Sequence, residues 1–155
     1  MSSTARIAAH GLAVTPPAGW EATIFRRPPA AGEMTFPVLH AATVPLSPNR
    51  GDYGAGQVEL LGTGDVFVSV LEFGPEAAAT PLFGGTTGIP GLTPDMFRPN
   101  QLQRTLPNQA GVQRFFSVQG RAFCVYAVVG SFAGRLALSS RANQIIGSLE
   151  IGPPP

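Results

Sequence analysis

The sequence contains no lysine, and all ten of its basic residues are arginine. GC-rich codon usage favours arginine over lysine, and this explanation indicates a bacterial source. Selection for the forked, two-point contacts that arginine makes with carboxylates and phosphates would give the same composition. The absence of lysine therefore leaves two explanations open and identifies no activity by itself.

Acidic residues are missing from the stretch between Met96 and Leu149, which nevertheless contains six arginines. The first 95 residues contain eight acids and four arginines, so the two parts of the chain carry opposite net charge. The C-terminal arginines either pair with these acids across the fold or face an acidic protein partner. A pI near 8.0 and the wide spacing of the arginines argue against nucleic-acid binding. Charged residues make up only 12% of the chain, which favours a protein partner or a homo-oligomer.

Cysteine is almost absent, since Cys124 is the only one and no intrachain disulfide can form. It lies in the apolar run 122–129, which predicts a buried and unreactive thiol. The chain also lacks the His, Cys and carboxylate spacings of metal sites, and it lacks recognisable catalytic and nucleotide-binding motifs. The sequence therefore predicts no metal and no cofactor, and it favours a non-catalytic protein over an enzyme.

Long apolar runs are absent as well. The most apolar stretch, 122–132, is much shorter than the roughly 20 residues that a membrane-spanning helix needs. Residues 1–9 do not contain the apolar region of a signal peptide. These absences predict a cytoplasmic protein without membrane insertion.

The residues that are present predict an α+β fold, in which an antiparallel β-sheet carries one principal C-terminal helix and a long Pro/Gly-rich loop. We expect one domain over residues 1–152, followed by a short proline tail at 153–155. Amphipathic spacing places the helix at about 139–147, with Ser139 or Ser140 as its N-cap. Two hairpins should turn at His10-Gly11 and at Gln119-Gly120. The expected strands are 6–9, 12–15, 20–26, 38–44, 66–73, 113–118, 121–130 and 148–151.

The long loop at 74–107 contains six of the sixteen prolines, so no continuous helix or strand can run through it. Its apolar residues indicate that it packs either on the protein's own core or on a partner. Arginine and aromatic residues are enriched at protein interfaces. The candidate partner-binding residues are therefore Met96, Phe97, Arg98, Leu102 and Arg104.

The two remaining candidates for chemistry are His40 and Glu72, each within an expected strand. His40 lies among apolar neighbours, which favours a buried structural histidine. Glu72 lies near a strand end, where solvent exposure is the usual reason for a carboxylate. The alternative hypothesis is a small-molecule-binding protein or enzyme, with His40 and Glu72 in a pocket between the sheet and the 74–107 loop.

The order of elements resembles the PsbP-like fold family, which includes the photosystem II extrinsic subunit and bacterial lipoproteins and secretion-associated chaperones. The likeness rests on an N-terminal hairpin, a Pro-x-Gly-Trp element at 17–20 and a closing helix-strand at 143–151. The resemblance implies an assembly or adaptor module, but it carries over no binding residue. The chain departs from the lipoprotein members because it has no lipid-acceptor cysteine near its start. The leading hypothesis is thus a non-catalytic adaptor in a bacterial cytoplasmic complex.

Overall fold

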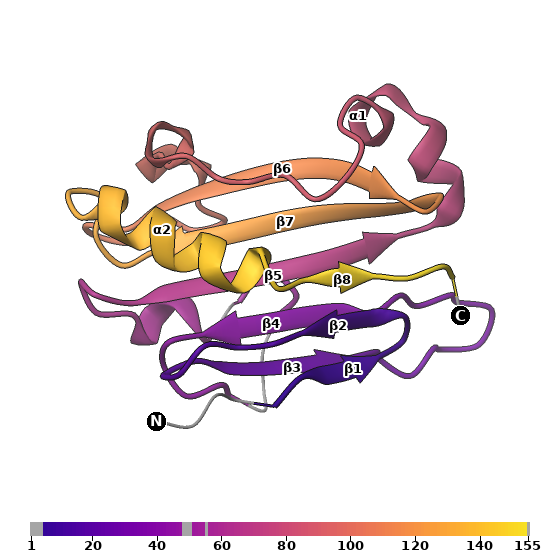
Figure 1. The fold of residues 1–155 in the computed structure, drawn as a ribbon, viewed down its shortest axis with the longest axis horizontal. Helices are drawn as coiled ribbons and strands as arrows, with labels where there is room; N and C mark the ends of the chain where they lie inside the picture. Colours follow the sequence, from indigo (N-terminus) through magenta and orange to yellow (C-terminus); the bar gives the residue numbers. More distant parts are fainter. Residues whose placement is uncertain (1–4, 48–50, 55, 155) are drawn as a thin grey trace.

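The computed structural model describes residues 5–47, 51–54 and 56–154, and it has the α+β fold that the sequence predicts. The described strands form two antiparallel sheets (Figure 1). The larger has the order β3-β4-β5-β7-β6, with bounds Glu21–Phe25, Val38–Ala42, Val66–Phe73, Arg121–Val129 and Ala110–Val118. The smaller has the order β1-β2-β8, with bounds Ile7–Ala9, Leu12–Val14 and Glu150–Ile151.

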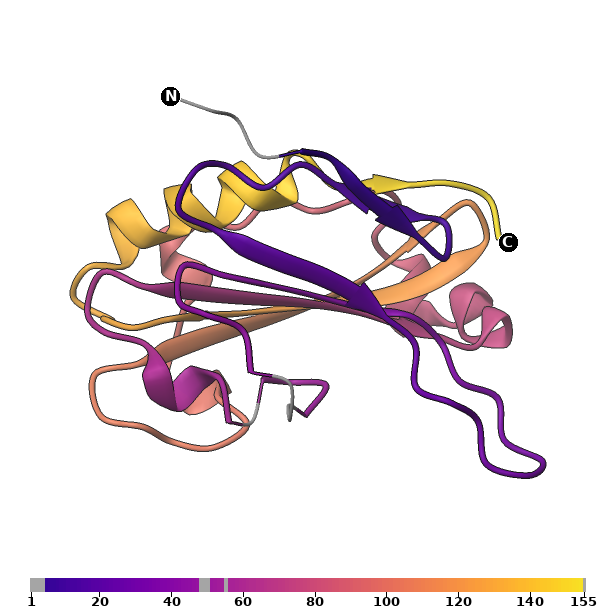
Figure 2. The ribbon, with the colours of Figure 1, turned by 90° about the horizontal axis from the view of Figure 1, so that it is seen from below.

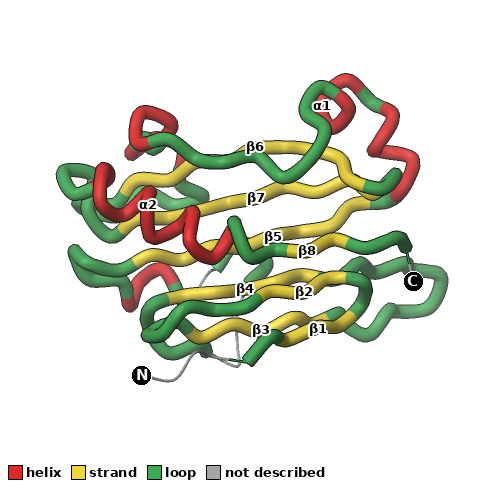
Figure 3. Tube along the Cα trace, viewed as in Figure 1, coloured by secondary structure: helices red, strands yellow, loops and turns green. Residues whose placement is uncertain are grey.

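Within the described residues, the one long helix is α2 (Arg135–Ile146), which follows β7, and the other helical segments are no longer than five residues (Figure 3). These are η1, η2, α1, η3 and η4, with bounds Val58–Leu60, Pro75–Ala79, Pro81–Gly84, Pro94–Met96 and Pro99–Gln101. The prediction of the helix start was wrong, because α2 begins at Arg135 with Gly134 as N-cap, and Ser139 lies inside it. None of the described helices combines the length and apolarity needed to cross a bilayer.

Both expected hairpins are present, and both use a two-residue turn with positive φ at each position. His10 and Gly11 have φ values of 54° and 77°, and Gln119 and Gly120 have 57° and 74°. This conformation matches the right-handed twist of the paired strands, and glycine adopts it without strain. The second turn pairs Val118 with Arg121 and thereby fixes the register of the β6–β7 hairpin.

The five-stranded sheet has two different faces, because side chains alternate along each strand. The helix face lies under α2 and the small sheet (Figure 2). It consists of the core residues Val68, Val70, Phe123, Val125 and Ala127. The loop face is partly covered by Val44, Leu46, Tyr53, Val58 and Leu61. It consists of Val38, Phe67, Leu71, Cys124 and Tyr126.

The 74–107 loop packs on the protein's own core, which was one of the two alternatives. Leu92 and Phe97 are only 3% and 1% exposed, and both belong to the main core on the helix face. The backbone N–H of Leu92 donates to the Asn143 side chain of α2, whose amide donates back to the Leu92 carbonyl. The loop therefore connects the β6 edge of the sheet with α2.

Candidate functional site

The loop face carries a hollow of about 300 Å³ between the β3–β4 loop and the segment 51–54. Strands β4 and β5 contribute apolar residues and Glu72 to its lining, and the surrounding loops contribute aromatic and charged side chains. The residues that matter for the argument are Arg27, Phe36, Val38, Asp52, Tyr53 and Phe73. Phe36, Tyr53 and Phe73 are only partly buried, so aromatic surface lies open to solvent here.

A second hollow of about 280 Å³ lies on the other side of the segment 51–54. Asp52 and Tyr53 line both hollows, so this segment is their common wall. The second hollow is lined by Val58, Leu102, Arg104, Gln109 and Tyr126, among others. We refer to the residues that line the two hollows as the loop-face surface.

The common wall is fixed to the sheet by its backbone. The carbonyl of Asp52 accepts hydrogen bonds from Ser69 Oγ at 2.6 Å and from His40 Nε2 at 3.0 Å. These two residues are cross-strand partners on β4 and β5, and both are fully buried. The Tyr53 ring packs edge-to-face on Tyr126 with ring centroids 5.4 Å apart. His40 therefore has a structural role, since it positions the segment that separates the hollows.

Two ion pairs between an arginine and a carboxylate border the loop-face surface. Arg27 Nη2 lies 2.7 Å from Asp52 Oδ1 at the first hollow, and Arg104 Nη2 lies 3.2 Å from Glu59 Oε2 at the second. Each pair supplies both a cation and an anion to the rim, so the border is polar without a dominant sign. Burial, with smaller contributions from Cys124 and Asp52, raises the pKa of Tyr53, which keeps this phenol neutral at ordinary pH.

The single cysteine lies beneath the loop face and lines neither hollow. Cys124 is 0% exposed, and burial raises the pKa of its thiol to about 11. Only the thiolate is nucleophilic, so burial and the raised pKa both disfavour reaction of this thiol at neutral pH. Among the described residues, moreover, no group of three or more His, Cys, Asp or Glu side chains is placed to hold a metal ion.

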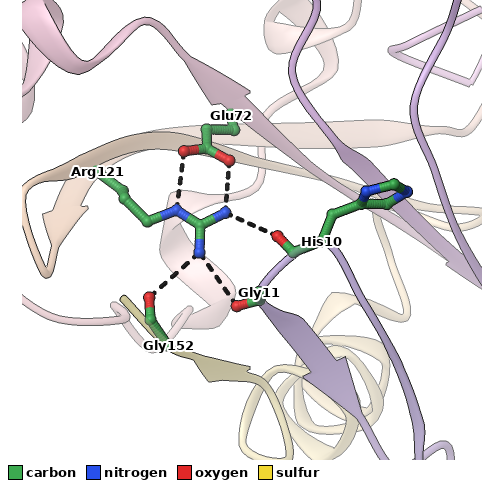
Figure 4. Close-up of polar contacts among 5 residues, drawn as sticks. All are labelled: His10, Gly11, Glu72, Arg121 and Gly152. Carbon is green, nitrogen blue, oxygen red and sulfur yellow. Dashed lines mark hydrogen bonds and ion pairs between the residues drawn. The ribbon is translucent and has the colours of Figure 1, made fainter. Parts of the chain in front are cut away.

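Arg121 and Glu72 form a buried ion pair on the helix face (Figure 4). Their side chains are only 1% and 9% exposed, and Arg121 Nε and Nη2 lie 2.8 and 2.6 Å from the two carboxylate oxygens. Arg121 also donates to the carbonyls of His10, Gly11 and Gly152, each at 3.1 Å. A guanidinium has five N–H donors, and each of them has an acceptor here. The pair thus joins the small sheet to the large one and has no donor left for a ligand.

The structure does not bring His40 and Glu72 together. His40 pairs with Ser69, and Glu72 lies three residues further along β5, so the two side chains point to opposite faces of the sheet. The expected exposure of Glu72 is also corrected, because its carboxylate is occupied by Arg121. Glu72 is among the residues that line the first hollow, but His40 lines neither hollow, so neither hollow is the pocket with both residues that the small-molecule hypothesis expected.

The candidate partner-binding residues are divided among three places. Leu102 and Arg104 line the second hollow, and Arg98 is exposed beside the edge strand β6. Phe97 is buried in the core, and Met96 packs against that core, where its sulfur accepts a hydrogen bond from Arg114. Phe97 is therefore corrected from a partner-binding residue to a core residue.

Sequence reasoning missed Phe36, Tyr53 and Phe73 as surface residues. Tyr53 lies in a glycine-rich stretch at 51–56, which by pattern alone indicates only a flexible loop. An aromatic residue inside such a stretch was the available signal, because a large apolar side chain in a loop needs something to pack against. Phe36 gives a similar signal, since it follows the proline-rich turn at 27–35.

The arginine-rich stretch is partly neutralised from within. Arg104 pairs with Glu59 and Arg121 with Glu72, and both acids come from the acidic N-terminal part of the chain. This is the internal pairing that was one of the two explanations for the charge asymmetry. Comparison of the chain with family models, curated proteins and solved structures finds no match.

Proposed function

We propose that the protein is a non-catalytic binding module that engages another protein through the loop-face surface. The observation that carries the proposal is the pair of adjoining hollows, whose linings combine apolar, aromatic and charged side chains. Partly exposed aromatic side chains beside apolar ones are typical of protein interfaces. Cys124 is a buried, neutral thiol beneath this surface, and His40 holds the carbonyl of Asp52, so both have structural surroundings rather than catalytic ones.

The shape and charge of the surface indicate the chemistry of the partner. Two hollows on either side of Tyr53 suit a segment with two apolar side chains that project past the common wall. Arg27 and Arg104 on the rim are each paired with an acid, so the rim itself favours neither sign. The acidic character of the partner is proposed instead from the arginine-rich stretch, in which Arg98 is exposed. We therefore propose a protein partner with an acidic border around an apolar segment, in keeping with an adaptor of a bacterial cytoplasmic complex and with the PsbP-like resemblance.

Site-specific photocrosslinking in the cells that naturally produce the protein would test the proposal. A benzophenone amino acid at Phe36 should crosslink a stoichiometric protein partner. The matched control is Leu136, which is apolar, 76% exposed and located on α2, on the other side of the sheet. Equal capture at both positions, or capture at neither, would refute binding at the loop-face surface.

A charge-reversal variant tests the expected sign of the partner. Arg98→Glu combined with Arg104→Glu should abolish capture at Phe36 while the melting temperature stays unchanged, since both side chains are exposed. Unchanged capture would remove the acidic border from the proposal. Native mass spectrometry of the gently purified protein separates the alternative, because a small ligand in place of a protein would indicate a small-molecule-binding protein.

A further inference from the structure

The two edge strands of the five-stranded sheet, β6 and β3, differ in how far other segments cover them. Edge strands carry unpaired backbone N–H and C=O groups that can pair with another strand, so proteins commonly cover them. At the β6 edge, Arg98 and Gly111 exchange two backbone hydrogen bonds of 2.9 and 3.0 Å. Ser117 donates to the Thr86 carbonyl at 2.9 Å and accepts from Gly88. Part of the 74–107 loop thus covers the β6 edge.

At the β3 edge, β1 packs beside the strand, but no described segment outside the sheet forms backbone hydrogen bonds to it. The N–H of Thr43 donates to the carbonyl of Val66, and the N–H of Glu72 donates to the carbonyl of Pro37. Every second residue from Pro37 to Thr43 therefore directs its backbone N–H and C=O groups toward β5. By alternation, the residues of β4 that face β3 are those paired with Glu21, Thr23 and Phe25.

Ala22 and Ile24 therefore direct their N–H and C=O groups outward from the sheet. No described backbone group bonds to these outward groups. In Figure 2, which views the molecule from the side of this edge, β3 lies at the front of the five-stranded sheet.

The sequence of β3 does not protect this edge either. Prolines flank the strand at positions 17 and 28 but are absent from Glu21–Phe25, and Glu21 is its only charged residue. The opposite end is followed directly by Arg26 and Arg27. In an antiparallel pair of two identical strands, the acidic start of each therefore lies beside the basic end of the other. Such a self-complementary edge favours a second copy of the same chain.

We propose that two copies of this protein associate by antiparallel pairing of their β3 strands, which makes one continuous ten-stranded sheet. The register follows from the outward groups: Ala22 of each copy exchanges hydrogen bonds with Ile24 of the other. Thr23 then lies opposite its own counterpart on the two-fold axis, as a non-hydrogen-bonded pair with Cα atoms about 4.5 Å apart. This interface is formed by the backbone of β3 and shares only Arg27, which follows the strand, with the loop-face surface.

An engineered disulfide tests both the dimer and its register. Thr23→Cys should form an interchain disulfide under mild oxidation, because the expected Cα separation lies within the range that disulfides span. Glu21→Cys is the matched control on the same strand and face. Its counterpart would lie four residues further along, roughly 13 Å away, so it should not crosslink. The native Cys124 is fully buried and should not interfere.

A proline variant tests the role of the open backbone groups. Ala22→Pro removes an outward N–H that the fold itself does not use, whereas Ala22→Val retains it. By sedimentation equilibrium, the unmodified protein and Ala22→Val should dimerise with concentration, and Ala22→Pro should stay a monomer with at least tenfold weaker association. A monomer at all concentrations together with no Thr23→Cys crosslink would overturn the proposal. So would equal crosslinking at positions 21 and 23, or pairing of this edge with a different protein.

Discussion

Replacing Arg121 with methionine should be among the most destabilising single substitutions in this chain. Methionine has a similar length and fits an apolar site, so the change removes the guanidinium without opening a large cavity. It leaves the Glu72 carboxylate, 9% exposed, without its partner, and it leaves the carbonyls of His10, Gly11 and Gly152 without their donor. Breaking a buried ion pair by removing one partner costs about 3–5 kcal/mol of unfolding free energy.

The assay is equilibrium unfolding in urea, read by the fluorescence of Trp20 and by far-UV circular dichroism. Because Arg121 holds the small sheet, hydrogen exchange should show the largest loss of protection in β1, β2 and β8. Arg6→Met is the matched control. Arg6 forms an exposed ion pair with Glu150, and losing this pair should leave the urea midpoint unchanged.

A double variant separates the carboxylate from the carbonyls. Adding Glu72→Leu to Arg121→Met removes the stranded charge and should recover part of the loss, while the three carbonyls remain unsatisfied. If Arg121→Met cost less than about 1 kcal/mol, or if the double variant were no more stable than the single one, the buried pair would not be the connection between the sheets.

Three further substitutions follow from the packing. Phe97→Ala should cost about 3–5 kcal/mol, measured by urea unfolding, because this side chain is 1% exposed in the core; a near-neutral effect would restore it as a surface candidate. Gly130→Ala should lower the melting temperature, because the added Cβ would lie 1.7 Å from the Gly62 carbonyl oxygen, and an unchanged value would contradict this close contact. Burial raises the pKa of Cys124 to about 11, so the unfolded thiol ionises first, and stability that is present at neutral pH is lost as pH rises from about 9 to 11. Cys124→Ala should make this alkaline decline about 2–3 kcal/mol shallower, and an identical slope would contradict the raised pKa.

Local patterns predicted most of the strands of this fold. The strand at Val66–Phe73 has the bounds expected from its run of Val and Phe, and the two X-Gly turns have the positive φ values that their hairpins require. These features depend on neighbours in sequence. The start of α2 was mislocated because Gly134 caps it without a side-chain hydrogen bond, so the usual serine signal pointed to the wrong residue.

Features that depend on distant residues were not predictable in the same way. Glu72 and Arg121 are 49 positions apart, and their pairing requires the β5–β7 register together with the turn at Gly11. The opposite orientation of His40 and Glu72 likewise follows only from the β4–β5 register. Phe97 and Arg98 are adjacent in sequence, yet one is buried and the other exposed, because the loop crosses the sheet edge at that point.

Dimerisation through β3 would affect binding at the loop-face surface, because the dimer axis relates the two copies of that surface. Phe25 of β3 packs with the loop-face residues, and a two-fold axis through Thr23 relates strands within one sheet. Both loop-face surfaces of a dimer would therefore open on the same side. A partner with two copies of its binding segment would then engage the second surface intramolecularly, which raises its apparent affinity without any new contact. Ala22→Pro should accordingly weaken capture of such a bivalent partner while leaving the binding of a single segment unchanged.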